Sequence, residues 1–417
     1  MNTPSFHLFE RYGVELEYML VQRDTLDVAP LADVVLRDAA GETVSDVERD
    51  GLCWSNELAL HVLELKTARP APVLAGLAET FQRGVHQVNA LAAVHGAVLL
   101  PSAMHPWMDP HTQTRLWPHD NSEVYAAFNR VFDCRGHGWS NLQSVHLNLP
   151  FAGDEEFGRL HAAIRLLLPL MPALAASSPI VDGRPSGLAD TRLEVYRRNC
   201  ARVPLVTGRV IPEPVFTREQ YERGILRPMY AAIAPHDPEG VLQHEWLNAR
   251  GAIARFDRST IEIRVLDVQE CPQADLAVVE LLVAVLRAMV HERWAGAAAQ
   301  RAWPVETLER VLLGTSRAGG EWLIEDEDYL LQFGCRGPMR AAEVWRRLAE
   351  SVVGGEDAWG APLLTILTHG TLSARLSAAA GAAPAREHLR MIYRRLSECL
   401  RAGTPFVPAG QPPGASA

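Results

Sequence analysis

The sequence predicts an α+β fold in which helices pack on a sheet and the carboxy-terminal part, from about residue 275, is helical. The first observation is an alternation of polar and apolar residues, typical of half-buried strands, at 13–21, 144–149 and 254–267. The second is a set of long apolar stretches, most of them at three-and-four spacing, which predicts helices at 72–95, 160–174, 221–234 and 275–294. Amphipathic segments predict further helices at 301–313, 339–351, 363–376 and 385–400.

No internal repeat and no stretch with the composition of a domain linker interrupts these elements. We therefore predict a single domain over residues 1–401, with the carboxy-terminal helices packed on the sheet. Residues 402–417 are rich in Pro, Gly and Ala, a composition that favours a disordered tail.

Composition and charge narrow the class of protein. The 417 residues are 48% hydrophobic and 22% charged, which is typical of a soluble globular protein. A net charge of −10 argues against a nucleic-acid-binding surface. It does not exclude an anionic nucleotide, because bound metal ions reverse the local field.

The cysteines and the apolar stretches predict a cytoplasmic protein without membrane contact. The six cysteines form no CxxC pair, so they indicate neither a zinc site nor a disulfide framework. The most apolar run, Leu276–Val290, contains Glu280 and Arg287 and is too short to span a bilayer. The first residues lack the pattern of a secretory signal.

The stretch Gly13–Val21 places two carboxylates on one face of a strand. Strict alternation puts Glu15 and Glu17 on that face, with Val14 and Leu16 on the other. Two neighbouring carboxylates repel each other and are costly to desolvate, whereas hard divalent cations such as Mg²⁺ prefer these oxygen ligands. The polar outer face of an edge strand is the alternative explanation.

Glu57 and Glu64 are seven residues apart, which would put them on opposite faces of one continuous strand. A bend, or a helix that leads into a strand, must lie between them if both point into one site. Leu63–Thr67 alternates well enough to be that strand. Glu57 is equally compatible with a surface position.

Two further strands carry polar residues on one face. In 144–149, His146 and Asn148 are either part of a sheet surface or a metal ligand with its hydrogen-bonding partner. In 254–267, Glu262 and Arg264 are either an ion pair or a metal ligand beside a phosphate-binding cation. Arg255 adds positive charge nearby.

Two segments outside the strands are rich in polar residues. Met104–Trp139 contains four histidines at no ligand spacing, which we interpret as loop residues around a pocket mouth, in a segment that could close as a lid. Ile180–Arg202 is basic and includes Arg192, whose guanidinium would suit a carboxylate or phosphate. A basic, exposed helix face would explain these arginines as simply.

Together these segments offer more negative charge than one site could hold without cations. Two or more Mg²⁺ ions would neutralise it and could hold the phosphates of a nucleotide against the arginines. The chain has no GxxxxGK[ST] loop, so any use of ATP would depend on metals and arginines.

The order GVELEY, NELALHVLELKT, SVHLNL, ASSPIVDGRPSG and TIEIRVLD resembles the glutamate–cysteine ligase family, in its bacterial and plant-like carboxylate–amine ligase branch. The resemblance covers roughly residues 10–295. It implies a glutamine-synthetase-like fold, with a curved antiparallel sheet and helices on its outer face. It also implies use of ATP and Mg²⁺, or Mn²⁺, to activate a carboxylate as an acyl phosphate that an amine attacks.

The resemblance assigns a role to each matching residue. Glu262 and Arg264 are the expected catalytic pair, and Arg192 resembles an arginine that binds the substrate carboxylate. The expected metal ligands are Glu15, Glu17, Glu57, Glu64, His146 and Glu262. The expected ATP-binding residues are His146, Asn148, Arg255 and Arg264.

The sequence departs from the family pattern in two places. After Gly187 it reads LADTRLEVYRRN, where many relatives have a glycine–tyrosine–serine-type continuation, and the helices after Trp294 match no pattern. The amine acceptor is therefore open, with glutamate or a similar acid as the carboxylate and cysteine as the default amine.

Two other functions are compatible with the residues, a guanidino phosphotransferase and a catalytically inactive homologue that acts as a binding partner. The expected partners are small molecules, and a homo-oligomer is possible.

Overall fold

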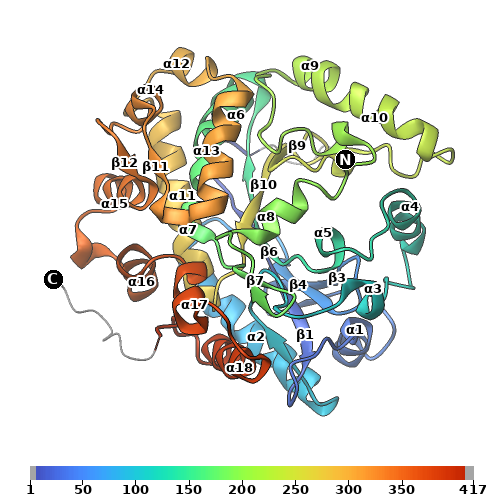
Figure 1. The fold of residues 1–417 in the computed structure, drawn as a ribbon. Coiled ribbons are helices and arrows are strands. Elements are labelled where there is room, and N and C mark those ends of the chain that lie inside the picture. The colour runs from blue at the N-terminus through green and yellow to red at the C-terminus, as the bar shows by residue number, and fades with distance from the viewer. Residues whose placement is uncertain (1–5, 409–417) are drawn as a thin grey trace.

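A computed structural model describes residues 6–408 of the chain, and an eight-stranded sheet forms its centre (Figure 1). The strand order is β2-β3-β4-β1-β6-β10-β9, with β5 paired to β1, and neighbouring strands are antiparallel. Its strands are β1 (Gly13–Gln22), β2 (Asp46–Arg49), β3 (Leu52–Asn56), β4 (Val62–Thr67), β5 (Ala97–Leu100), β6 (Ser144–Pro150), β9 (Ala252–Arg255) and β10 (Thr260–Asp267). Two small sheets consist of β7 (Ile180–Val181) with β8 (Arg184–Pro185), and β11 (Leu323–Ile324) with β12 (Met339–Arg340).

Helices surround this sheet and make up most of the second half of the chain. The helices before β9 are α1 (Ala32–Ala40), α2 (Leu77–Val94), α3 (Pro110–Gln113), α4 (Ser122–Phe132), α5 (His137–Ser140), α6 (Gly153–Leu167), α7 (Pro172–Ala175), α8 (Thr191–Tyr196), α9 (Arg218–Tyr221) and α10 (Arg227–Ile233). Those after β10 are α11 (Pro272–Val290), α12 (Ala297–Arg301), α13 (Val305–Ala318), α14 (Glu327–Leu331), α15 (Ala341–Val352), α16 (Ala361–His369), α17 (Leu372–Ala380) and α18 (Arg386–Ala402). Short 3₁₀ or π turns are η1 (Leu168–Leu170), η2 (Pro204–Val206), η3 (Glu222–Leu226), η4 (Ala234–His236), η5 (Glu245–Leu247), η6 (Gly319–Glu321) and η7 (Glu356–Ala358).

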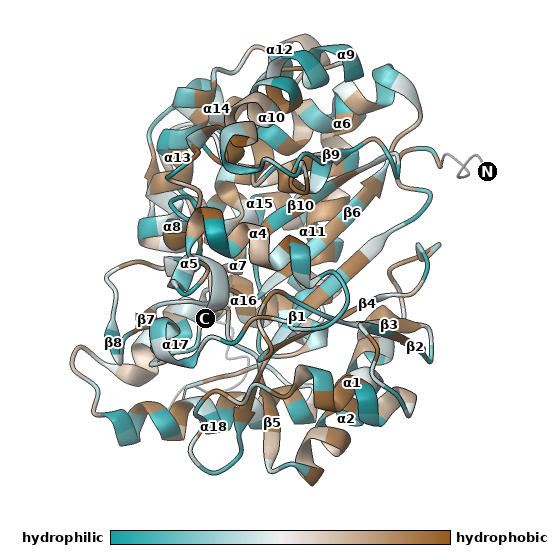
Figure 2. Cartoon of the chain, turned by 90° about the vertical axis from the view of Figure 1, so that its right-hand side faces the viewer, coloured by the Kyte–Doolittle hydropathy of each residue, from teal (hydrophilic) through white to brown (hydrophobic). Residues whose placement is uncertain are grey.

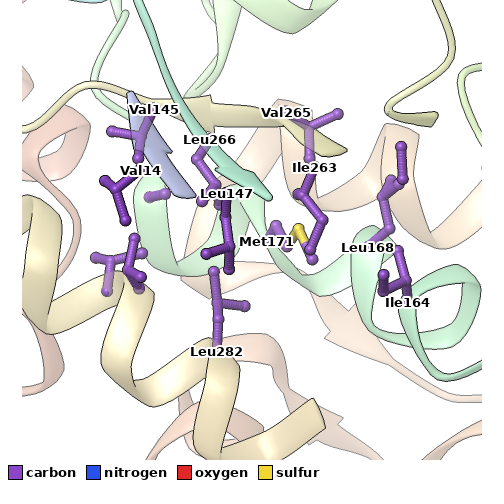
Figure 3. Close-up of a cluster of buried hydrophobic side chains, with 14 of the residues drawn as sticks. Val14, Val145, Leu147, Ile164, Leu168, Met171, Ile263, Val265, Leu266 and Leu282 are labelled. Atoms are coloured by element: carbon purple, nitrogen blue, oxygen red, sulfur yellow. The ribbon is translucent and has the colours of Figure 1, made fainter. Parts of the chain in front are cut away.

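The apolar face of the sheet packs on helices. Val14 of β1, Leu147 of β6 and Ile263 of β10 are fully buried, and Figure 3 shows them facing Leu282 of α11 and Met171, which lies between η1 and α7. Because side chains alternate along a strand, the residues between them point to the opposite face. This packing therefore turns the polar residues of β1, β6 and β10 away from the core, as the alternation predicts.

Several elements differ from the sequence-based predictions. The stretch 254–267 is a hairpin of β9 and β10, not one strand, since the chain turns at Ser259, which has a φ of +53°. The segment 104–139 contains α3, α4 and the start of α5 as well as loops. The helix expected at 363–376 is divided into α16 and α17 at Gly370, whose φ of +84° ends α16.

A disordered tail is predicted from residue 402, but the structure shows that residues 402–408 are ordered and packed. Phe406 is 1% exposed and packs in a second apolar cluster with α17 and α18, which covers the end of β1 (Figure 1). Its backbone N–H donates to Glu270 Oε1 at 3.2 Å, and its carbonyl accepts from the buried Arg375. Residues 403–408 are therefore part of the packed structure, and the rest of the predicted tail, 409–417, lies outside the described residues.

Among residues 6–408, no helix combines the length and the apolar character that crossing a membrane requires (Figure 2). The six cysteines are free thiols, as the absence of a CxxC pair predicts.

One of the four histidines of the 104–139 segment is a core residue and not a pocket-mouth residue. His105 is 1% exposed, and its Nε2 lies 2.7 Å from the carbonyl oxygen of Leu26. Burial lowers the pKa of His105 to about 4 from its ordinary value of 6.5. The neutral ring is thus the form that the fold accepts.

This burial predicts a loss of stability in acid. The unfolded chain binds a proton at His105 below pH 6.5 and the folded chain only near pH 4, so stability is lost as the pH falls through this window. Between about pH 6.5 and pH 5 the loss from this histidine is about 2 kcal/mol. His105→Gln should reduce the pH dependence of the free energy of unfolding, measured with urea, by that amount. The exposed His111→Gln is the control, and an unchanged pH dependence in His105→Gln would contradict this account.

Candidate active site

The register of the sheet brings the predicted acids and the histidine side by side. Glu17 of β1 is directly opposite Glu64 of β4, and Glu15 of β1 is directly opposite His146 of β6. Directly opposite residues of neighbouring strands project to the same face. Residues that are far apart in the sequence therefore meet on the polar face of three adjacent strands, away from the core.

Five of the six predicted metal ligands form two clusters. In one cluster, ligand atoms of Glu15, Glu64 and His146 lie within 4.8 Å of one another. In the other, those of Glu17, Glu57 and Glu64 do so. Glu64 belongs to both clusters, so it could bridge two neighbouring ions.

The loop between β3 and β4 is the bend that lets Glu57 join Glu64. Glu57 follows the last residue of β3, and Glu64 lies in the middle of β4, the antiparallel neighbour of β3. The bend is thus a strand-to-strand connection and no helix intervenes in residues 57–61.

In the second cluster, burial and mutual repulsion disfavour the ionised form of Glu57 and Glu64 when no metal ion is bound. Burial, followed by repulsion from Glu64 and Glu17, raises the pKa of Glu57 well above its ordinary value. Burial and the charge of Glu15 raise the pKa of Glu64 in the same way, opposed by Lys66. Carboxylates that share a buried site in this way are relieved by a cation, and oxygen donors of this kind suit Mg²⁺ or Mn²⁺.

His146 is bound to both acids of β1. Its Nδ1 lies 3.0 Å from Glu15 Oε2, and its Nε2 lies 3.8 Å from Glu17 Oε1. Burial disfavours the imidazolium, but the hydrogen bond to Glu15 and the charge of Glu17 raise the pKa of His146 to about 9. Despite its burial, Glu15 has a lowered pKa because His146 bonds to it. Asn148 Nδ2 also donates to Glu15, at 3.0 Å, which orients this carboxylate.

Lys66 and Ser55 also belong to the site, which the sequence pattern did not predict. Lys66 Nζ lies 2.5 Å from Glu64 Oε2 and 2.8 Å from Ser55 Oγ, and Ser55 Oγ donates to Glu64 at 2.7 Å. The ammonium group thus partly neutralises the shared ligand. The period of two along Leu63–Thr67 places Lys66 on the same face as Glu64 and was a signal for it.

The predicted catalytic pair is an ion pair beside the clusters. Arg264 Nε lies 2.8 Å from Glu262 Oε1, and Arg255 Nη1 lies 3.7 Å from Glu262 Oε2. Although burial opposes ionisation, the charges of Arg264 and His146 lower the pKa of Glu262. Glu262 is not in either cluster of ligand atoms, so its role as a metal ligand stays a prediction.

Arg192 lines the cavity over these residues, but its guanidinium is engaged within the protein, so its role as a ligand for the substrate carboxylate stays a prediction. Its Nε lies 2.6 Å from Asp267 Oδ1, and the two side chains are 2% and 0% exposed. Its Nη2 donates to the carbonyls of Leu266 at 2.8 Å and Arg264 at 3.1 Å. A change of register between Ile263 and Leu266 puts Asp267 opposite Ser144, on the polar side where Arg192 reaches it. We therefore interpret Arg192 as a residue that stabilises the position of β10.

A cavity of about 630 Å³ opens over these residues. Glu17, Glu57 and His146 line its acidic part, and Arg255 and Arg264 line its basic part. A second cavity, of about 550 Å³, is lined by residues of α13, α15 and α17, and none of the predicted site residues lines it.

The fold, with an antiparallel sheet whose apolar face packs on helices, is that of the glutamine-synthetase-like ligases. More particularly, the chain belongs to glutamate-cysteine ligase family 2, whose sequence model matches residues 11–393. The family and the fold predicted from the order of the motifs are thus confirmed.

Two relatives show how far this similarity extends. An uncharacterized protein of Archaeoglobus fulgidus is 36% identical over 320 residues, which are 77% of this chain and 83% of that protein. A protein of Bradyrhizobium sp. (strain ORS 278), whose name gives it provisionally as glutamate–cysteine ligase 2, is 27% identical over 361 residues, covering 84% and 77% of the two chains.

Solved structures of low identity share the fold. The glutamate–cysteine ligase of Francisella tularensis, in complex with AMP, matches with a TM-score of 0.59 at 14% identity, over 96% of this chain and 90% of that chain. A bifunctional glutathione synthetase from Pasteurella multocida matches with a TM-score of 0.61 at 14% identity, over 95% of this chain. This chain spans 53% of that bifunctional protein.

Proposed function

We propose that this protein is an ATP-dependent carboxylate–amine ligase that joins the side-chain carboxylate of glutamate, or of a similar acid, to an amine. The observation that carries the proposal is the meeting of acids and arginines around one cavity, in a member of glutamate-cysteine ligase family 2. Cysteine, the amine in the family name, is the reference acceptor.

The proposed reaction has two steps. A carboxylate oxygen attacks the γ-phosphorus of ATP, the bond to the β-phosphate oxygen breaks, and ADP leaves. The amine nitrogen then attacks the carbonyl carbon of the acyl phosphate. Phosphate leaves with the carbon–oxygen electron pair, the amide forms, and the nitrogen loses a proton.

The residues of the cavity suit these steps. Glu15, Glu17, Glu57 and Glu64 would hold Mg²⁺ or Mn²⁺, which when bound offsets the charge of the triphosphate, and His146 would join them after losing its proton.

Arg264 and Arg255 face the same cavity and would stabilise charge on the phosphoryl group during transfer. Burial disfavours the charged form of Arg264, but Glu262 raises its pKa, so the guanidinium stays charged. Val124, Phe128 and Trp139, from the segment 104–139, form part of the cavity wall and would limit access of water to the acyl phosphate.

The test is to incubate the protein with ATP, Mg²⁺ and glutamate against a panel of amines, following ADP release and product mass. An amide product with release of phosphate supports the proposal. A phosphorylated product without an amide would instead indicate a phosphotransferase, and binding of ATP without turnover would indicate an inactive homologue. Glu15→Gln is the negative control, because it removes a carboxylate of the first cluster.

A further inference from the structure

Besides Tyr196 of α8, four aromatic side chains line the same cavity as the acids. They are Tyr125 and Phe128 of α4, Trp139 of α5 and Trp246 of η5, and each is only half-buried. Half-exposed aromatic rings gathered in a cavity provide apolar surface that a ligand can cover. The charged groups that we propose for phosphoryl transfer lie in other parts of the cavity and do not cover this apolar surface. We call these four residues the aromatic wall.

The aromatic wall is held in place before any ligand binds. The ring centroids of Phe128 and Trp139 are 5.1 Å apart, and those of Phe128 and Trp246 are 5.8 Å apart. Phe132, which does not line the cavity, stacks on Trp139 with centroids 5.4 Å apart. The indole N–H of Trp139 donates to the carbonyl of Asn199 at 3.1 Å, so its polar atom is satisfied within the protein. The exposed part of Trp139 is thus apolar and fixed in orientation.

The aromatic wall also adjoins the acidic part of the cavity. Asn56 Nδ2 donates to Tyr125 Oη at 3.0 Å, and Asn56 precedes Glu57 in the chain. Burial, together with the charge of Glu57, raises the pKa of Tyr125, so the phenol stays neutral. A group that rests on the aromatic wall is therefore next to the place where the proposed phosphoryl transfer and amide formation occur.

We propose that the aromatic wall binds a planar aromatic ring of the amine acceptor, so that the acceptor is an aromatic amine or aromatic amino acid. This inference rests on the proposed ligase activity. The acceptor nitrogen must reach the acyl carbon beside the acids. The rest of the acceptor then lies against the surface next to the acids, which is the aromatic wall. The adenine of ATP is separated from the γ-phosphate by the ribose and two further phosphates, so it suits this position less well. Cysteine has no group that would cover the aromatic wall.

The test compares phenethylamine with cyclohexylethylamine and cysteine as acceptors, with ATP, Mg²⁺ and glutamate present. We expect phenethylamine to have a KM about three- to tenfold below that of cyclohexylethylamine, since aromatic pairs add to plain burial, and at least about tenfold below that of cysteine. Trp139→Ala and Phe128→Leu should each raise the KM for phenethylamine by about tenfold and change the KM for ATP less than about twofold. Trp294→Ala, at a half-buried tryptophan that does not line this cavity, is the control and should change either KM less than about threefold.

Two kinetic outcomes would overturn this assignment. One is equal or better use of cysteine. The other is a rise in the KM for ATP, and not for the amine, in Trp139→Ala, which would assign the aromatic wall to adenine.

If no amine is ligated, the proposed function fails, and titration calorimetry of phenethylamine into the protein tests the aromatic wall separately. Binding that Trp139→Ala and Phe128→Leu weaken would support it. Absence of binding, or binding that neither variant changes, would overturn it.

Discussion

Replacing Glu64 with glutamine is expected to lower the rate of the proposed ligation by at least about 100-fold, because one substitution changes both metal clusters. The affinity for Mn²⁺, measured by electron paramagnetic resonance, should fall by at least about tenfold. The fold should persist, since glutamine has the same size and removes a carboxylate that repels Glu57. Thermal unfolding without metal would check this point.

The matched control is Glu48→Gln on β2, an exposed glutamate two strands away in the same sheet. It should leave Mn²⁺ binding and the reaction rate unchanged. If Glu64→Gln retains the Mn²⁺ affinity of the wild type, the bridging role of Glu64 is wrong, whatever happens to the rate.

Replacing Arg192 with methionine is expected to lower the free energy of unfolding by about 3–5 kcal/mol. The substitution leaves Asp267 buried without its ion-pair partner, in a place where burial already raises the pKa of that carboxyl against the opposing charge of Arg192. It also removes two hydrogen bonds to the backbone of β10, next to Arg264. Urea denaturation at neutral pH measures the loss.

The control for this loss is Arg198→Met. Arg198 pairs with Glu194 at 2.6 Å, but its side chain is 67% exposed, and an exposed pair contributes at most about 1 kcal/mol. If Arg192→Met is as stable as the control and raises the KM for glutamate alone, then Arg192 binds the substrate carboxylate after all.

The alternation of residues along single strands was enough to predict which side chains share a face. It placed Glu15 with Glu17, His146 with Asn148, and Glu262 with Arg264, because the period of a strand does not depend on its neighbours. The turn and the change of register around β10 were not predicted, since both depend on pairing with β9 and β6.

The partners of a charged side chain were less predictable than its position along a strand. Lys66 was visible on the face of Glu64, but its contact with that carboxylate required the strand geometry. Arg192 was chosen for its chemistry, and its partner Asp267 is 75 residues away. Such contacts join residues that are far apart in the sequence, so a local sequence pattern does not predict them.

The sequence by itself determined the α+β class, the family and the set of acids, because these follow from local periodicity and from motifs in order. Only the tertiary structure decided which acids share a cluster, that Glu64 belongs to both clusters, that Arg192 is engaged by Asp267, and that an aromatic wall adjoins the acids. The physical reason is that strand order and register bring distant residues together, and these are fixed by burial of the apolar face and not by any single strand.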